Sequence, residues 1–379
     1  MRSPFAIRTA ATTTAITLAL AACTATPDEG EDSSTSSSSP TSSTGSSSTT
    51  TTTTTTARAE VSGAPAALTK VVAKKYGDHE LDGTAKLGTW RGAKVAVVTA
   101  DDDVTLAVRP KGKTAWKVVG GWWPSLGSAG KVDLGGSRHV LVLGSDARPG
   151  EDVERSRADA IQLLGVDGSG GAGLMGFARD LWVPIPGHGH GKLNSSMVFA
   201  GPDGQAASVE SISGIDVDGY VVTSMKGFSA MVDELGGLDF VAPKALNSHL
   251  DGGTIGKGRH RLSGDNALAW ARERKTLPGG DFDRSRNQGL LLAAAAVQAR
   301  VEGPGAVPKA LTVIDKHASS DLSAQEMLLF TASFYRVNPT KVGHAVAKGP
   351  TAMQSGQSIV RLDGESKAAF RDFEDGRLS

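Results

Sequence analysis

The hydrophobic pattern divides the folded part of the chain into two regions. In residues 61–138, short apolar runs are separated by turn residues, and Val104, Leu106 and Val108 alternate with other residues as in a half-buried strand. This pattern predicts a small β-rich accessory domain over residues 61–138 that contains a short β-meander.

From residue 139 onward the pattern is typical of an α/β protein. Continuous apolar runs at residues 139–146, 160–166 and 174–178 predict buried strands. Segments with helical periodicity, such as residues 227–235 and 290–301, follow these runs. We therefore predict an α-β-α sandwich around a mixed central sheet over residues 139–379.

Residues 271–288 combine basic side chains with a break between two predicted helices. Ser263 is a candidate N-cap for a helix over residues 262–270, so Arg272 and Arg274 fall where that helix ends. The sequence Pro-Gly-Gly at residues 278–280 then interrupts the helical pattern.

A second helix follows this break, and its start is rich in groups that bind anions. Asp281 or Asp283 is expected to cap it, and Arg284 falls in its first turn. A cation there opposes the helix dipole, but a bound anion would reverse the sign of this effect. Gln288 lies one turn further on the same face. We interpret the segment as a clamp for a ligand that carries several negative charges, with a solvated charged loop as the alternative.

The residues before 61 predict export and tethering. Residues 1–22 resemble a signal peptide, with Arg2 and Arg8 before a short apolar and threonine-rich stretch. This stretch ends in Leu-Ala-Ala-Cys at Cys23, the only cysteine of the protein, and resembles a bacterial lipoprotein cleavage box. The alternative is an ordinary secretory signal with an inert thiol. Residues 23–60 are rich in serine and threonine and are expected to form a disordered tether with a reach of about 35 Å. The predicted location is the outer face of the cytoplasmic membrane, with a lipid anchor on Cys23.

The overall charge argues against nucleic acid as a partner. The 379 residues include 40 Lys and Arg and 40 Asp and Glu, so the chain has no net field that would attract a polyanion. Recognition of an anion must therefore be local.

Charged residues follow the predicted strands of the main domain. Asp146 comes at the end of the first strand, Arg157 and Asp159 precede the second, and Arg179 follows the third. Ligands of α/β sheets gather at such strand ends. Carboxylates and arginines together are poor core residues, but they suit Mg²⁺ bound to phosphate oxygens.

Three other features can be explained either by a structural role or by a functional one. His188 and His190 form a spaced pair that can bind metal, although the flanking glycines favour a flexible loop. Trp122 and Trp123 suit either packing against the main domain or a sugar-stacking platform. The very apolar helix at residues 290–301 must be covered on nearly all sides, either by core side chains or by a lipid tail.

An ordered set of motifs resembles the LytR-CpsA-Psr family of cell-wall enzymes. The pieces that carry the resemblance extend from residue 142 to residue 284. They are Val-Leu-Gly-Ser-Asp-Ala-Arg at 142–148, Arg-Ala-Asp-Ala at 157–160, Ala-Arg-Asp at 178–180, Gly-Lys-Leu-Asn at 191–194, Gly-Phe-Ser-Ala-Met-Val-Asp-Glu-Leu-Gly-Gly-Leu at 227–238, Ala-Leu-Ala-Trp-Ala-Arg-Glu-Arg-Lys at 267–275 and Gly-Asp-Phe-Asp-Arg at 280–284.

The resemblance implies a Mg²⁺-assisted phosphotransferase outside the cytoplasmic membrane. Such an enzyme moves an anionic glycopolymer from a polyprenyl diphosphate carrier to the muramic acid hydroxyl of peptidoglycan. By the resemblance, Asp146 and Asp159 would hold the metal, and Asp281 would orient the arginines or act as base. The diphosphate would be gripped by Arg157, Arg179, Arg272, Arg274, Arg284 and Gln288.

The chain departs from the family pattern in the second helix. The common pattern Gly-Arg-Thr-x-Arg-Gln is replaced by Asp-Arg-Ser-Arg-Asn-Gln at residues 283–288, which moves one arginine by a residue, or about 100° around a helix. Arg286 is therefore expected to point away from the phosphates.

Three other functions stay open at this point. One is a pyrophosphatase that hydrolyses prenyl diphosphates, and another is a non-catalytic lipoprotein that binds polyprenyl phosphates. The third is a wall-binding module built on Trp122 and Trp123.

Overall fold

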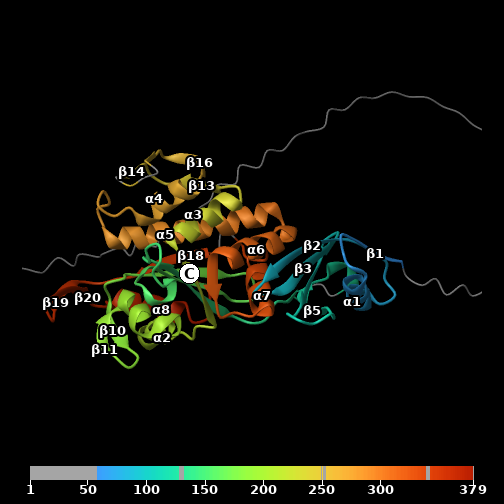
Figure 1. Cartoon of the computed structure of the whole chain (residues 1–379), viewed down its shortest axis with the longest axis horizontal. Helices are drawn as coiled ribbons and strands as arrows, with labels where there is room; N and C mark the ends of the chain where they lie inside the picture. The colour runs from blue at the N-terminus through green and yellow to red at the C-terminus, as the bar shows by residue number, and fades with distance from the viewer. Residues whose placement is uncertain (1–57, 128–131, 249, 251–252, 339–341, 379) are drawn as a thin grey trace, which may run out of the picture.

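The computed structural model describes residues 58–127, 132–248, 250, 253–338 and 342–378. Two six-stranded sheets dominate it, one in the accessory region and one in the main domain (Figure 1). The predicted signal peptide, Cys23 and most of the tether lie outside the described residues. Within the described part, no helix is both long and apolar enough to cross a membrane.

The main domain is an α-β-α sandwich around a mixed sheet, as predicted. Its strands have the order β17-β12-β7-β8-β9-β18. β7 is parallel to β12 and antiparallel to β8, and β9 is antiparallel to β8 and parallel to β18. The strands are β7 (Arg138–Ser145), β8 (Ala158–Val166), β9 (Ala172–Phe177), β12 (Gly219–Ser224), β17 (Ala318–Ser320) and β18 (Val342–Ala347).

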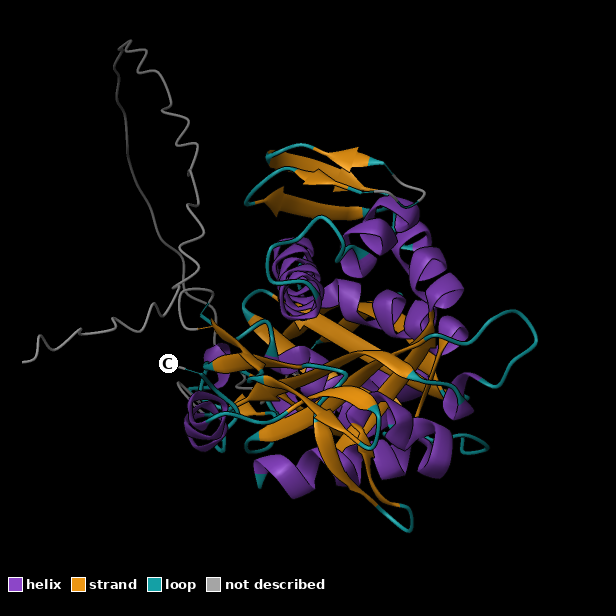
Figure 2. Ribbon diagram, turned by 90° about the vertical axis from the view of Figure 1, so that its left-hand side faces the viewer, coloured by secondary structure: helices purple, strands orange, loops and turns teal. Residues whose placement is uncertain are grey.

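Helices cover both faces of this sheet (Figure 2). On one face, α5 packs across β8, β9 and β18, and α3 packs on β12 and β7. On the other face, α2 packs on β12 and α8 packs on β18. The helices are α2 (Ser196–Ser213), α3 (Met225–Glu234), α4 (Gly264–Arg272), α5 (Asp281–Glu302), α6 (Val307–His317), α7 (Ala324–Ser333) and α8 (Gly364–Asp372).

The accessory sheet is sandwiched between its own helix and two helices of the main domain. α1 and the core around Leu68 and Val72 cover one face, and the core around Leu311 and Leu328 of α6 and α7 covers the other. The expectation of a half-buried strand was wrong, because β4 is buried on both faces. The elements are β1 (Ala59–Ser62), α1 (Ala66–Tyr76), β2 (Leu81–Trp90), β3 (Ala93–Ala100), β4 (Asp103–Arg109), β5 (Lys117–Trp122) and β6 (Val132–Asp133).

The same packing decides the role of the tryptophan pair. Trp122 lies in the core shared with α6 and α7, and Trp123 lies in the core under α1, where its indole N–H donates to Thr105 Oγ1 at 2.8 Å. Both rings are more than nine-tenths buried. They are packing residues, and the hypothesis of a sugar-stacking platform on this pair was wrong.

Two segments expected to be loops contain short hairpins. The glycine-rich segment after Arg179 forms β10 (Trp182–Ile185) and β11 (Gly189–Lys192). The polar segment before α4 contains β14 (Leu246–Asn247) and β15 (Thr254–Ile255), and β16 (Gly258–Leu262) pairs with β13 (Leu238–Ala242). β19 (Thr351–Gln354) and β20 (Gln357–Val360) form a further hairpin near the C-terminus.

Because α6 and α7 are part of both cores, we expect the accessory sheet and the main domain to unfold together. Leu311 on α6 is fully buried in the shared core. Leu311→Ala should lower the free energy of unfolding by about 2–5 kcal/mol, measured by denaturant titration. Tryptophan fluorescence and far-UV circular dichroism should give one coincident transition.

Leu87→Ala is the matched control, because Leu87 lies on the accessory sheet but is 45% exposed. Its effect should stay below about 1 kcal/mol. Two separate transitions in either variant would show that the two parts are independent.

Candidate functional site

The site forms where three neighbouring strands of the main sheet begin or end. β7 runs into Asp146, β9 runs into Arg179, and antiparallel β8 starts between them with Asp159. The β7–β8 register shifts from Ser145 opposite Ala158 to Gly144 opposite Ala160, so Asp159 is the extra residue of a β-bulge. Bulges redirect a side chain away from the sheet face, and they are frequent beside active sites.

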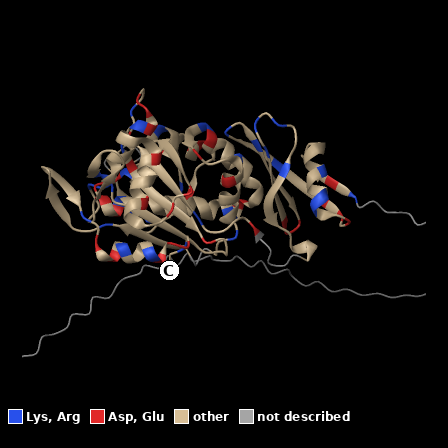
Figure 3. Ribbon diagram, turned by 90° about the horizontal axis from the view of Figure 1, so that it is seen from below, with Lys and Arg blue, Asp and Glu red and all other residues tan. Residues whose placement is uncertain are grey.

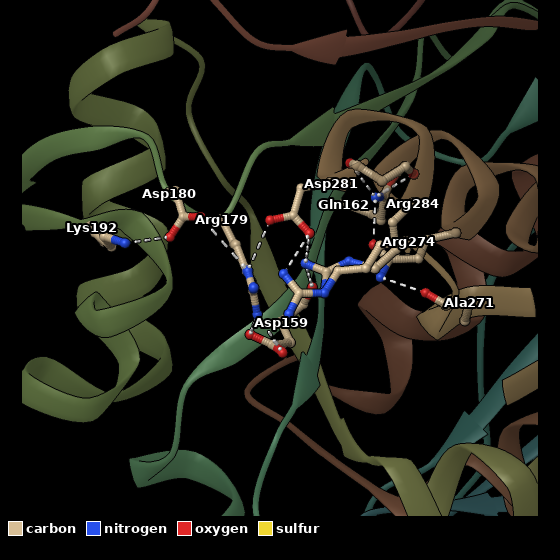
Figure 4. A network of polar contacts seen from close by, with 11 residues as sticks. Asp159, Gln162, Arg179, Asp180, Lys192, Ala271, Arg274, Asp281 and Arg284 are labelled. Carbon is tan, nitrogen blue, oxygen red and sulfur yellow. Dashed lines mark hydrogen bonds and ion pairs between the residues drawn. The ribbon is translucent and has the colours of Figure 1, made fainter. Parts of the chain in front are cut away.

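Arg179 and two carboxylates form the centre of the site (Figure 4). Arg179 Nη1 donates to both oxygens of Asp159 at 3.0 and 2.9 Å. Its Nε lies 3.4 Å from Asp281 Oδ2, which belongs to the first turn of α5. Burial acts to lower the pKa of Arg179, but Asp159 and Asp281 outweigh it, so the pKa is raised and the guanidinium stays charged.

Asp281 faces arginines and does not cap α5. The N-cap of α5 is Gly280, and no side chain caps it, so the expectation that Asp281 or Asp283 would do so was wrong. Asp281 Oδ1 lies 3.4 Å from Arg284 Nη2 and 3.6 Å from Arg274 Nη1. Asp283 instead accepts a hydrogen bond from the backbone N–H of Gly279.

Arg284 is the buried cation of the site. It is 7% exposed, and burial lowers its pKa, while Asp281 opposes this effect and Arg179 adds to it. Its Nε, Arg179 Nε and Asp281 Oδ1 have no hydrogen-bond partner in the part of the chain that the structure describes. The ion pairs at 3.4 to 3.6 Å are longer than ordinary hydrogen bonds. Donors are thus held together and left available to an anion.

The other predicted residues lie around this centre at different depths. Asp146 is half-buried, and its Oδ1 accepts from the backbone N–H of Arg157 at 2.9 Å. The side chains of Arg157, Arg272 and Arg274 are exposed, and Arg272 and Arg274 border the cavity described below. Arg286 is 60% exposed on its side chain and pairs with Asp283, which fits the expectation that it points away.

A buried polar group that the sequence analysis did not single out fixes α5 against the sheet. Gln162, in the middle of β8, donates to the carbonyl and hydroxyl of Ser285 at 3.1 Å and to Gln288 Oε1 at 3.3 Å. Gln288 in turn donates to the Ala271 carbonyl at the end of α4. The only hint of this role in the sequence was that Gln162 is a polar residue inside the apolar run of β8. These amides hold the first turns of α5, and with them Arg284 and Asp281, at the strand ends.

A cavity of about 640 Å³ opens beside the arginines and extends between the sheet and the helices. Its volume lies within the range of about 300–1,000 Å³ found for small-molecule sites. Polar groups gather at one end, namely Asp159, Gln162, Arg179, Arg272, Arg274, Arg284 and Gln288. Most of the remaining wall is apolar and includes Leu164, Leu174, Leu291, Leu292, Ala296, Ile314, Phe334 and Val342.

The apolar segment of α5 therefore lines a cavity as well as contributing to the core. Leu291 belongs to the core under α4 and also borders the cavity, as do Leu292, Ala295 and Ala296. Two polar rings, His344 of β18 and Tyr335, also lie in this wall. Burial lowers the pKa of His344 to about 4, so that it is neutral at physiological pH. The cavity wall is thus mostly apolar, with the arginine cluster at one end, although Gln298, Arg300 and Glu302 near the end of α5 also border it.

The carboxylates near the arginines are the kind of ligand that a hard divalent cation prefers. Asp146 and Asp159 come from neighbouring strands, and Mg²⁺ is commonly bound by one or two carboxylates together with phosphate oxygens and water. Asp159 already binds Arg179 with both oxygens, so a metal would share one of them. Within the described residues, no three or more His, Cys, Asp or Glu side chains are grouped so that they could hold a metal ion, and His188 stacks on Phe199.

Comparison with known proteins identifies the family. Residues 127–373 match the LytR_cpsA_psr family, which is more than half of the chain, and the protein belongs to this family. The solved structure of TagV from B. subtilis has the same fold, with a TM-score of 0.55 and 22% identity over 63% of this chain and 96% of that one. TagT bound to LI-WTA gives a TM-score of 0.53 and 23% identity over 65% and 93%.

Two relatives show higher sequence identity. The polyisoprenyl-teichoic acid--peptidoglycan teichoic acid transferase TagU of Bacillus mycoides is 31% identical over 191 residues, which is 50% of this chain and 61% of TagU. The regulatory protein MsrR of Staphylococcus aureus is 35% identical over 162 residues, or 42% of this chain and 48% of MsrR. The match thus spans about three fifths of TagU and half of MsrR.

The buried arginine is expected to dominate the binding of a diphosphate. Arg284→Lys should weaken the affinity for farnesyl diphosphate by about 10- to 100-fold, because lysine loses the planar donor fork in a buried position. Isothermal titration calorimetry would measure it. Arg286→Lys on the same helix is the control and should change the affinity by less than about twofold. Equal losses in both variants would contradict the assignment of Arg284.

The apolar wall is expected to respond to the length of a prenyl chain. Ala296→Trp fills the cavity and should weaken the binding of undecaprenyl phosphate by about tenfold or more, with a smaller effect on farnesyl phosphate. Val301→Trp, on the same helix but 80% exposed, is the control. An equal effect on both chain lengths would show that the tail lies elsewhere.

Proposed function

We propose that the protein is an extracytoplasmic phosphotransferase that moves an anionic glycopolymer from a polyprenyl diphosphate carrier to the muramic acid hydroxyl of peptidoglycan. One observation carries the proposal: a long apolar cavity ends at a cluster of arginines that have unpaired donors. A prenyl chain matches the apolar part, and a diphosphate matches the cationic end. The names of the TagU relatives support this substrate class.

The chemistry needs positioning and charge neutralisation more than a covalent intermediate. The acceptor oxygen attacks the phosphorus that carries the glycopolymer, and the bond from this phosphorus to the bridging oxygen breaks. Polyprenyl phosphate leaves, and the proton of the hydroxyl passes to a carboxylate of the site. Arg179 and Arg284 neutralise the charge that builds up on the leaving phosphate, while Asp281 keeps the two guanidinium groups oriented.

Mg²⁺ belongs to the proposal as a cofactor. Asp146 and Asp159 would hold it, and it would neutralise charge on the diphosphate when bound. Arg179 at the end of β9 and Arg284 on α5 would bind the same phosphates, so metal and guanidinium groups would share the charge between them.

The location is also part of the proposal. A lipid on Cys23 would anchor the chain at the outer face of the cytoplasmic membrane. The serine- and threonine-rich residues before 58 would then let the site reach both the carrier lipid and the wall. The formal charge is balanced, and acidic and basic residues are interspersed over the molecule (Figure 3), which agrees with a local anion site and no nucleic-acid partner.

Two alternatives use the same residues. A pyrophosphatase would let water attack the same phosphorus, and the exposure of Arg157, Arg272 and Arg274 leaves the polar end accessible to water. A non-catalytic carrier would need the arginines but not the carboxylates Asp146 and Asp159.

Residues 58–379, expressed without the tether, test these functions. Mass spectrometry should find a co-purified polyprenyl phosphate or diphosphate. A short prenyl diphosphate sugar, incubated with Mg²⁺ and a peptidoglycan fragment, should give a phosphodiester product, and without the fragment slow hydrolysis at most. Asp146→Ala and Asp159→Ala should lower turnover by about 100-fold or more while lipid binding persists. Unchanged turnover in these variants would eliminate the enzyme, and hydrolysis alone would identify a pyrophosphatase.

A further inference from the structure

The cavity determines the side from which an acceptor must approach. In phosphoryl transfer the attacking and leaving oxygens are roughly in line with the phosphorus. If the prenyl phosphate leaves into the cavity, the attacking hydroxyl comes from the opposite side of the arginine cluster. Arg179 and Arg284 border the cavity, whereas Asp180 and Lys192 do not.

Asp180 and Lys192 lie on that opposite side. Figure 4 shows them beyond Arg179, away from Gln162 and Arg284. Lys192 Nζ lies 2.9 Å from Asp180 Oδ1, and Asp180 Oδ2 lies 3.9 Å from Arg179 Nε. Both side chains keep about a quarter of their surface exposed, at 28% for Asp180 and 25% for Lys192. A polar path therefore runs from the phosphate site to the β10–β11 hairpin.

This hairpin has one buried face and one open face. Val183 and Ile185 alternate into the core beside α2. On the open face, Trp182 pairs in register with Lys192, and Pro184 pairs with His190. Directly opposed residues of an antiparallel pair place their side chains on the same face. Trp182 is thus a neighbour of Lys192, which contacts Asp180.

Trp182 differs from every other tryptophan of the protein. The chain has six, and Trp90, Trp116, Trp122, Trp123 and Trp270 are more than nine-tenths buried. Trp182 is half-buried, and within the described residues its side chain takes part in no hydrogen bond or ring contact. A large ring that is accessible at the edge of a charged site, without a partner, suits the apolar face of a sugar.

From these positions we propose that the open face of the β10–β11 hairpin binds the glycan strand of the acceptor. Trp182 stacks on a sugar ring, Pro184 and His190 extend the surface, and Asp180 accepts a hydrogen bond from the attacking hydroxyl. Lys192 holds the Asp180 carboxylate in place. This assignment rests on the proposed function for the identity of the acceptor, and it defines a subsite separate from the lipid cavity and the arginine cluster.

The test measures, for variants of residues 58–379, the KM for the acceptor glycan and the Kd for a donor analogue. Trp182→Ala should raise the KM for a muramic-acid-containing tetrasaccharide by about tenfold. Trp182→Phe should keep the KM close to that of the unmodified protein, because phenylalanine also has a flat aromatic ring. The Kd for farnesyl diphosphate should stay within about twofold in both variants. His188→Ala, at the hairpin tip where the ring stacks on Phe199, is the matched control and should leave the acceptor KM unchanged.

Direct binding separates this inference from the proposed function. In a ¹⁵N spectrum the six indole N–H signals report the six tryptophans, and the signal absent in Trp182→Phe belongs to Trp182. The tetrasaccharide should shift this signal and leave the buried ones in place. A shift of the Trp182 signal without any phosphoryl transfer would support the glycan subsite and contradict the transferase function. Transfer with an unchanged acceptor KM in Trp182→Ala would overturn the subsite and keep the transferase, and neither shift nor transfer would reject both.

Discussion

The site depends on the ion cluster that joins the edge of the sheet to the first turn of α5. Asp281 lies among Arg179, Arg274 and Arg284, and Arg179 also binds Asp159 on the bulge of β8. Removing one carboxylate from such a cluster costs stability, because a mostly buried cation is left with fewer partners. With the Asp180–Lys192 pair included, the four cations exceed the three carboxylates by one charge, so the cluster gains from an added anion. The same contacts thus position α5 and favour the binding of an anion.

The fold class and the location of the site were predictable from the sequence because both depend on local patterns. Buried strands have continuous apolar runs, and Asp146, Asp159 and Arg179 stand directly at the ends of such runs. The partners of these residues were not predictable. The Asp281–Arg179 contact joins segments about 100 residues apart, and the choice of Gly280 over Asp281 as N-cap depends on arginines that only the tertiary fold brings near. The β10–β11 hairpin was missed because its glycines and prolines resemble a loop.

The β4 error has a related cause. The alternation of Val104, Leu106 and Val108 with other residues predicts that one face of the strand is exposed to solvent. The intervening residues, Thr105 and Ala107, are small enough to be buried under α1 instead. A main-domain helix on the other face then completes the burial. Sequence periodicity within one region cannot reveal a cover that comes from more than 200 residues further along the chain, as α6 and α7 do.

Helix α6 has a further consequence because its two sides belong to different environments. Leu311 packs in the core under the accessory sheet, while Ala310 and Ile314 border the cavity beside the arginines. Gly88 of β2 approaches α6 so closely that a Cβ there would meet the Pro308 carbonyl oxygen. A ligand that binds only the native state stabilises everything that unfolds with it. A lipid bound in the cavity, as proposed, would therefore protect the accessory sheet from proteolysis without contacting it.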